Sequence, residues 1–350
     1  MSATSSETYL RTRVAIFSKR LLGSEDLARL MSTPLEELSG RYQLESFLEQ
    51  GADLKLDSHI LERALLRLLM LEFSILLRPL DQEARELLLN WSRKFELYNL
   101  KTLIRGKLNG LDIETIRDDL YDLPESIRLP HELLLGAESV SEMLRLLESG
   151  AFASIARQAR QVYEELNEPF SLDAAIDRLY YAGLRKSVEQ SHLRDQAGLR
   201  HLVACLIDRQ NILWLLRYRF AYGFAPSKAY YLLIPAGGGI GRAKLMKLAN
   251  LESFESLITS LPSHFSQLLA GTNNSMQVRQ RLDQHVGDEA RWLLRDSSSA
   301  VLAALCYLVA REKDLRMIFA IIQGHLLALE EPVIAEALGS VSEPSLHEAV

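Results

Sequence analysis

Cysteine, proline and glycine are scarce in this chain of 350 residues, which contains 2, 10 and 18 of them respectively. Few prolines and glycines are expected in a mostly helical chain, because proline breaks helix interiors and glycine weakens them. The two cysteines, Cys205 and Cys306, predict no disulfide framework and are typical of a reducing compartment. No run of about 18 apolar residues occurs, so the sequence predicts no direct membrane span.

A strong charge of either sign is also missing. Lys and Arg number 40 against 46 Asp and Glu, and the resulting net charge of −6 is too mild to indicate a nucleic-acid partner. The hydrophobic content of 48% is enough for real cores and excludes a disordered chain. Residues 1–8 are rich in serine and threonine, and without a basic start and an apolar core they predict no signal peptide.

Sequence motifs for metal binding or catalysis are equally sparse. The eight histidines show no ligand spacing, and without paired cysteines or H-x-x-x-H the sequence predicts no metal site and no cofactor. A D-D-x-x-D string occurs at Asp118, Asp119 and Asp122. Such strings hold Mg²⁺ against a diphosphate in helical prenyl-transferring enzymes. A second acid-rich metal motif is absent, which favours a solvated acidic turn before Pro124.

A short string returns three times along the chain. Its copies are ELYNLKTLIRGK at 96–107, DRQNILWLLRYR at 208–219 and REKDLRMIFAII at 311–322. In the first two copies an acidic residue precedes an asparagine by three positions, and in the third an aspartate takes the asparagine position. Such a period predicts one structural unit used three times. The residues that define the repeat are Glu96, Asn99, Asp208, Asn211 and Asp314.

Each string is preceded by a shorter recurring segment: MSTPLEEL, AESVSEML and NLESFESL. We expect Thr33, Ser139 and Asn250 to be the helix N-caps of these segments. Between segment and string, apolar residues are spaced three and four apart, which favours helix over strand. The sequence therefore predicts an all-α fold of three similar domains and a C-terminal tail, with boundaries at 9–115, 116–225, 226–329 and 330–350.

These residues carry a resemblance to a known family. The start of the chain (Tyr9 to Leu38), the string ELYNLKTLIRGK and the stretch YYLLIPAGGG (Tyr230 to Gly239) resemble the C subunit of V/A-type rotary ATPases, which is similar to the d subunit of the vacuolar enzyme. The resemblance implies three helical domains with pseudo-threefold symmetry that form a funnel. It also implies a non-catalytic central-stalk subunit, cytoplasmic and peripheral to the cell membrane. Its partners would be the central rotor shaft subunits and the membrane proteolipid ring, in proton or sodium transport linked to ATP.

Basic residues gather in the first two strings, and they are the candidate partner interface. One hypothesis is that they meet acidic groups on the shaft or the ring. The alternative is that they are solvated and only complement helix C-termini. The repeated asparagines have two readings as well, a partner contact or an internal hydrogen bond, and their recurrence favours the internal bond. The basic residues concerned are Lys101, Arg105, Lys107, Arg217 and Arg219.

Two other functions stay open at this point. The first is a helical-repeat scaffold of another assembly, although a period above 100 residues is long for a solenoid. The second is a Mg²⁺-dependent α-helical prenyl-diphosphate enzyme that uses Asp118, Asp119 and Asp122.

Overall fold

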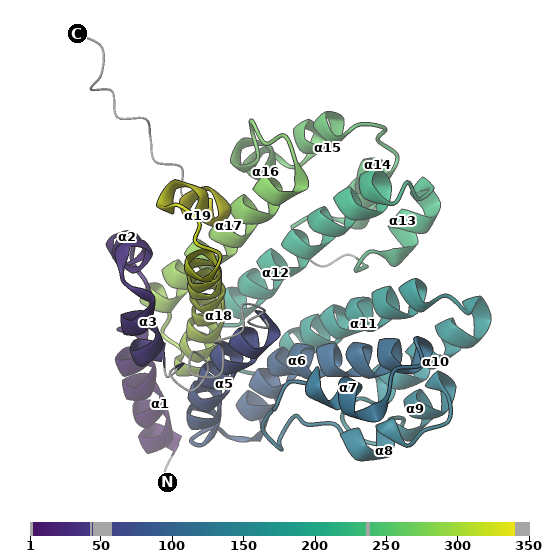
Figure 1. The fold of residues 1–350 in the computed structure, drawn as a ribbon, viewed down its shortest axis with the longest axis horizontal. Coiled ribbons are helices and arrows are strands. Elements are labelled where there is room, and N and C mark those ends of the chain that lie inside the picture. The colour runs from purple at the N-terminus through teal and green to yellow at the C-terminus, as the bar shows by residue number, and fades with distance from the viewer. Residues whose placement is uncertain (1–2, 43, 45–57, 236–238, 340–350) are drawn as a thin grey trace.

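The computed structural model describes residues 3–42, 44, 58–235 and 239–339. Within these ranges every regular element is a helix and none is a strand, so the predicted all-α class is confirmed (Figure 1). Six helices have 20 residues or more: α5 (Ser58–Leu77), α6 (Gln82–Leu108), α11 (Pro169–Glu189), α12 (Gln196–Leu216), α17 (Ser275–Asp296) and α18 (Ala300–Leu326).

The remaining helices are shorter and connect or flank these six. They are α1 (Ala3–Ser18), α2 (Ser24–Ser32), α3 (Leu35–Tyr42), α7 (Ile113–Asp118), α8 (His131–Leu135), α9 (Val140–Leu146), α10 (Ala153–Leu166), the π-helical turn η1 (Arg217–Ala221), α13 (Pro226–Leu232), α14 (Arg242–Ala249), α15 (Phe254–Ser260), α16 (Ser263–Leu268) and α19 (Glu331–Leu338).

The six long helices form a closed circuit. They occur in the chain as three consecutive pairs, α5/α6, α11/α12 and α17/α18. Each pair packs on the next through α6 with α11 and α12 with α17, and α18 returns to pack on α5. The turn at 78–81 joins α5 to α6, and the rings of Phe73 and Trp91 meet across that pair with centroids 6.3 Å apart. No pair is left at a free end of the arrangement.

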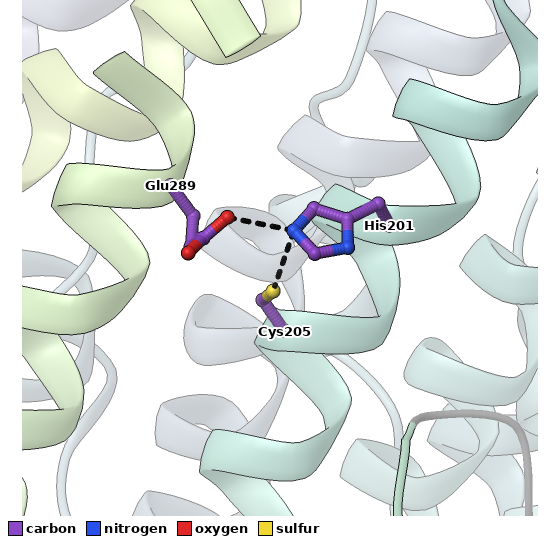
Figure 2. A group of neighbouring side chains, drawn as sticks. All are labelled: His201, Cys205 and Glu289. Atoms are coloured by element: carbon purple, nitrogen blue, oxygen red, sulfur yellow. Dashed lines mark hydrogen bonds and ion pairs between the residues drawn. The ribbon is translucent and has the colours of Figure 1, made fainter. Parts of the chain in front are cut away.

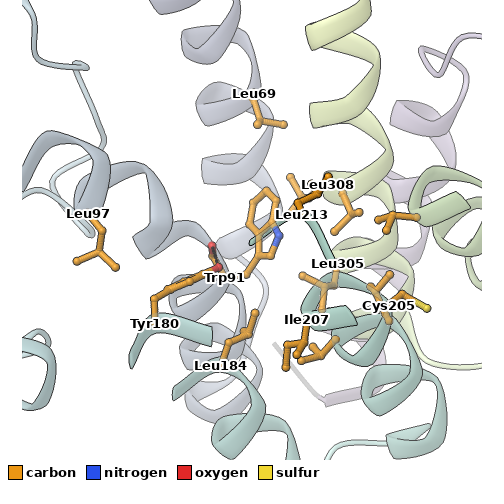
Figure 3. Close-up of a cluster of buried hydrophobic side chains, with 14 of the residues drawn as sticks. Leu69, Trp91, Leu97, Tyr180, Leu184, Cys205, Ile207, Leu213, Leu305 and Leu308 are labelled. Atoms are coloured by element: carbon orange, nitrogen blue, oxygen red, sulfur yellow. Dashed lines mark hydrogen bonds between the residues drawn. The ribbon is translucent and has the colours of Figure 1, made fainter. Parts of the chain in front are cut away.

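The three pairs share one hydrophobic core (Figure 3). Trp91 of α6, Tyr180 of α11, Leu213 of α12 and Leu308 of α18 are all buried in this cluster. The Tyr180 hydroxyl donates a hydrogen bond of 2.8 Å to the backbone carbonyl of Trp91, which satisfies the polar end of a buried aromatic ring. The pairs are therefore held to one another by a continuous apolar centre as well as by their neighbours in the circuit.

The two ends of the described chain meet at the third pair. The N-terminal helices α1, α2 and α3 pack on α18, and α2 also packs on the C-terminal helix α19 (Figure 1). Residues 331–338, within the segment predicted as a C-terminal tail, form α19, which packs on α18. Segments more than 290 residues apart in the sequence thus lie side by side, as the hydrogen bond between Leu22 and Asp314 also shows.

Only one of the three predicted N-caps is correct. Ser139 begins α9 and its side chain accepts a hydrogen bond from the Glu142 N–H. Thr33 was a wrong prediction, because it ends α2 and its hydroxyl donates back to the Arg29 carbonyl. Asn250 was also wrong, since it ends α14, and the next helix is capped three residues later by Ser253. A residue type that is favourable as an N-cap is also favourable at a helix end or in a turn. The residue type alone therefore does not show which position is the N-cap.

The long helices α6 and α18 end in the same way. A Cβ atom added to Gly106 would lie 2.5 Å from the side chain of Ile116, and one added to Gly324 would lie 2.5 Å from Ile334. These contacts bring α7 and α19 tightly against the ends of α6 and α18. The sequences GKLNGLDIETI at 106–116 and GHLLALEEPVI at 324–334 correspond over this turn, so the likeness of the first and third copies extends beyond the repeated string.

We predict that Gly106→Ala and Gly324→Ala each destabilise the protein by about 1–3 kcal/mol, because the added methyl group must displace a buried isoleucine. The matched control is Gly183→Ala in the interior of α11, where no heavy atom lies within 4 Å of the added Cβ. That change should stabilise the protein by up to about 1 kcal/mol, since alanine is the better helix former. Urea-unfolding midpoints measure all three. Equal midpoint shifts for Gly106→Ala and Gly183→Ala would contradict the close packing.

Candidate functional site

The first copy of the repeated string binds a non-helical segment further along the chain. The Asn99 side chain accepts a hydrogen bond of 2.8 Å from the Tyr121 N–H and donates one of 3.0 Å to the Tyr121 carbonyl. Glu96 accepts a hydrogen bond of 2.7 Å from the Leu129 N–H, and His131 Nε2 lies 2.6 Å from the same carboxylate oxygen. The side chains of Glu96 and Asn99 are both fully buried. We call this arrangement the backbone clamp.

The second copy makes the same bonds. The Asn211 side chain accepts a hydrogen bond of 2.9 Å from the Ile234 N–H and donates one of 3.3 Å to the Ile234 carbonyl. The Asp208 carboxylate accepts from the N–H groups of Gly239 and Ile240. The clamped residue lies 22 positions after the asparagine in the first copy and 23 positions after it in the second. The acidic residue and the asparagine at equivalent positions of the two strings therefore make equivalent hydrogen bonds to backbone groups.

The third copy clamps a segment from the opposite end of the chain. The Asp314 carboxylate accepts a hydrogen bond of 2.8 Å from the Leu22 N–H. Aspartate has no N–H to donate to the Leu22 carbonyl, and Arg291 of α17 supplies that donor at 2.9 Å. The guanidinium also pairs with Asp314 at 2.5 Å. Asp314 and Arg291 together thus make the two bonds that a single asparagine makes in each of the other copies.

In the third copy the residue type at the acidic position has also changed. Arg311 stands where Glu96 and Asp208 stand, and it donates to a backbone carbonyl, that of Arg20, instead of accepting from N–H groups. Arg311 also donates to the buried carboxylate of Glu72 on α5. The irregular third string is consequently fitted to a different backbone segment, and it ties α18 to α5.

The structure places the five predicted interface cations in different settings. Lys107 donates to the carbonyl of Leu135 at the end of α8 at 3.4 Å, and Arg219 donates to the carbonyls of Phe224 and Leu251, so both bind backbone of this chain. Arg217 is exposed and donates from Nε to the Tyr222 hydroxyl at 2.6 Å. That these cations contact a partner stays a prediction.

The other two predicted cations belong to a larger group that we call the charged band. Lys101 pairs with Asp177 at 2.7 Å and Arg105 with Asp173 at 3.3 Å, in both cases from α6 to α11. The band continues through pairs that join α6 to α18 and α12 to α17. Its members, drawn from all three helix pairs, are Lys94, Lys101, Arg105, Asp173, Asp177, Arg209, Arg217, Arg279, Asp283, Glu312 and Arg316.

Cations are in excess in the part of the charged band carried by α12, α17 and α18. Burial would raise the pKa of the Asp283 carboxyl, but Arg209, Arg316 and Arg279 together lower it. Partial burial and the neighbouring Arg209 lower the pKa of Arg279, although part of its side chain reaches solvent. Among the described residues Arg217, Arg279 and Arg316 form no ion pair within 4.0 Å, and all three are exposed. This part of the band therefore offers positive charge to solvent.

The acidic string at 118–122 lies at the end of α7 and in the segment that follows it. Asp118 and Asp119 lie at the end of α7, where Asp119 is the C-cap and the Asp118 carbonyl accepts from Arg63. Asp122 pairs with Arg128 at 2.7 Å. These three residues are absent from the one group of potential metal ligands found within the described ranges. Nothing in this arrangement favours the prenyl-diphosphate enzyme.

That group of potential ligands was missed by the sequence reasoning. His201 and Cys205 of α12 meet Glu289 of α17, with their ligand atoms all within 4.8 Å of one another (Figure 2). A search for paired cysteines or paired histidines overlooks a histidine and a cysteine four residues apart. Glu289 comes from a helix distant in the sequence, so no local sequence pattern predicts that it joins the other two.

A family model described as ATP synthase (C/AC39) subunit matches residues 10–337, which include all three copies of the repeated string. The chain belongs to this family. The resemblance seen in the sequence is thereby confirmed.

Similar proteins that match over nearly their whole length are each named as the C subunit of an A-type ATP synthase. That of Methanosarcina mazei is 22% identical over 95% of this chain and 93% of its own. That of Halobacterium salinarum is 26% identical, covering 94% of this chain and 96% of its own. That of Methanocaldococcus jannaschii is 23% identical, covering 95% and 86%. In the part of this chain that the structure describes, no helix combines the length and the apolar character needed to cross a bilayer.

The third clamp generates a rescue prediction. Arg291→Met should destabilise the protein by about 3–5 kcal/mol, because it leaves the buried Asp314 carboxylate without its cation and the Leu22 carbonyl without its donor. Adding Asp314→Asn should recover most of this loss, since an asparagine amide can make both bonds to Leu22. Unfolding midpoints in urea are the measurement.

The control for this prediction is Arg295→Met, one turn further along α17 at an exposed position, which should change stability by less than about 0.5 kcal/mol. If the double variant is no more stable than Arg291→Met alone, the equivalence of the third clamp to the other two is wrong.

Proposed function

We propose that this protein is a non-catalytic central-stalk subunit of a V/A-type rotary ATPase, and that it couples the central rotor shaft to the membrane proteolipid ring. The family assignment and the relatives named as C subunits of A-type ATP synthases support membership of such a complex. The closed circuit of long helices carries the coupling role. The protein would lie at the cytoplasmic side, peripheral to the cell membrane, in proton or sodium transport linked to ATP.

The proposed architecture is three copies of one unit around a pseudo-threefold axis, open as a funnel. Each copy would be built on one long pair and its backbone clamp. The third clamp reaches Leu22, which supports assigning α1, α2 and α3 to the third copy. The linear boundaries 9–115, 116–225, 226–329 and 330–350 stay a prediction, and the clamps favour dividing the chain in a cyclic order instead.

Stiffness is the property that coupling demands, and the circuit has it at every junction between pairs. Lys101 and Asp177 join α6 to α11, and Arg209 and Asp283 join α12 to α17. At the third junction, the Glu72 carboxylate of α5 accepts from both Arg311 and Tyr307 of α18. The Glu72–Arg311 pair is buried, and removal of one partner of such a pair is costly, so this junction resists being pulled apart. The pairs at the other two junctions are partly exposed and add less. A load applied to one pair is therefore passed to both of its neighbours.

The cationic part of the charged band is the proposed contact for an acidic partner. Arg217, Arg279 and Arg316 are exposed cations that form no ion pair within 4.0 Å among the described residues. Arg217 and Arg316 are both close enough to Arg279 to lower its pKa. Such a surface attracts a partner of opposite charge and speeds its association. The tip of a rotor shaft or a ring loop that carries Asp and Glu would complete it.

Charge reversal tests this contact. In the assembled complex, Arg217→Glu with Arg316→Glu should weaken binding to the shaft or the ring by about tenfold or more, because like charges would face the acidic partner. ATP-driven ion pumping should fall while ATP hydrolysis continues, as expected for a coupling part without chemistry of its own. Pumping and hydrolysis are measured in parallel in reconstituted vesicles.

The matched control is Arg200→Glu with Arg295→Glu, two exposed positions that carry the same change in net charge. It should leave binding and pumping intact. Crosslinking of the unaltered protein in native membranes should attach shaft and proteolipid subunits. Crosslinks that contain neither kind of subunit would refute the proposed role, and equal loss in both double variants would refute the assignment of the charged band.

A further inference from the structure

Two pairs of potential metal ligands face each other between α12 and α17. His201 and Cys205 are four residues apart on α12, and His285 and Glu289 are four residues apart on α17. Residues at i and i+4 lie on the same face of a helix. Two such pairs on packed helices can present four side chains to one point, and a tetrahedral site requires four ligands.

The distances are close to those of a zinc site. In a tetrahedral site with bonds of about 2.0 Å to nitrogen or oxygen and about 2.3 Å to sulfur, neighbouring ligand atoms lie roughly 3.3–3.5 Å apart. His201 Nε2 lies 2.7 Å from Glu289 Oε2 and 3.7 Å from Cys205 Sγ (Figure 2). His285 Nδ1 lies 3.9 Å from the other oxygen of Glu289. The ligand atoms of His201, Cys205 and Glu289 lie within 4.8 Å of one another, and His285, which lies outside that group of three, would join them after a side-chain rotation.

The surroundings suit a cation that enters from solvent. The His201 side chain is 48% exposed, whereas the side chain of Glu289 is 28% exposed. Cys205 is buried beneath them at 8% exposure, which protects the thiol. The histidine therefore lies at the entrance and the cysteine at the base of the cluster.

We propose that His201, Cys205 and Glu289, completed by His285, bind one Zn²⁺ ion that bridges α12 and α17. A borderline-soft ion that accepts sulfur, nitrogen and oxygen ligands in tetrahedral geometry is the one that this donor set selects. The two helices belong to successive long pairs, so the ion would reinforce the junction already held by Arg209 and Asp283. Nothing in this site depends on the coupling role.

Binding of the ion must displace one proton. A cysteine thiol ordinarily has a pKa of about 8.5, so near neutral pH the free protein carries the thiol form of Cys205. Zn²⁺ replaces the thiol proton, a zinc–sulfur bond forms, and the proton leaves to solvent. No oxidant or reductant takes part.

Cobalt titration tests the site in the full chain. The protein, stripped of metal by a chelator under reducing conditions, should bind one equivalent of Co²⁺ with a thiolate-to-cobalt charge-transfer band, and Zn²⁺ should remove that band. Cys205→Ser should abolish the band, and Glu289→Gln, which keeps the size of the side chain, should weaken binding by about tenfold or more. Zn²⁺ should also raise the melting temperature of the unaltered protein by a few degrees.

The matched control is Cys306→Ser, which changes the other buried cysteine and should leave the band intact. Circular dichroism shows whether each variant is folded. Absence of a charge-transfer band in the unaltered protein, or its persistence in a folded Cys205→Ser variant, would overturn the proposal.

Discussion

The fold depends on how three helices satisfy the backbone of segments that are not themselves helical. Buried N–H and C=O groups need partners, and one left without a partner costs about 1–3 kcal/mol. At Tyr121 and Ile234, a buried asparagine in the middle of a long helix makes both hydrogen bonds to the residue's peptide groups. The segments after the first two long pairs are thereby fixed against the pair that precedes them. In these two copies the clamp thus sets the direction in which the chain leaves the pair.

The same constraint explains why the third copy is irregular. In the third copy the clamp takes Leu22 from near the start of the chain. Replacement of asparagine by Asp314 would lose one of the two hydrogen bonds, and Arg291 restores it. The change from asparagine to Asp314 is therefore one part of a two-residue replacement, and Arg291 is the other part. The result is a circuit of long helices without a free end, which is the feature on which the proposed coupling role depends.

The sequence predicted the helical class, because apolar spacing is a local pattern, and the acid–asparagine string could be noticed as a repeat for the same reason. Its caps at Thr33 and Asn250 were wrong, since a residue that suits a helix start also suits a turn. The partner of Asp314 and the meeting of Cys205 with Glu289 could not be predicted. Both depend on which helices become neighbours, and that is decided by the packing of the whole core and not by any window of sequence.

The closed circuit is tested most directly by native-state hydrogen exchange at the three clamped amides, those of Tyr121, Ile234 and Leu22. If each is held by an equivalent buried side chain, all three should exchange only through large-scale unfolding, with similar protection. An amide of Leu22 that exchanges as fast as an unstructured peptide, while the other two stay protected, would show that the N-terminal segment does not close the third copy.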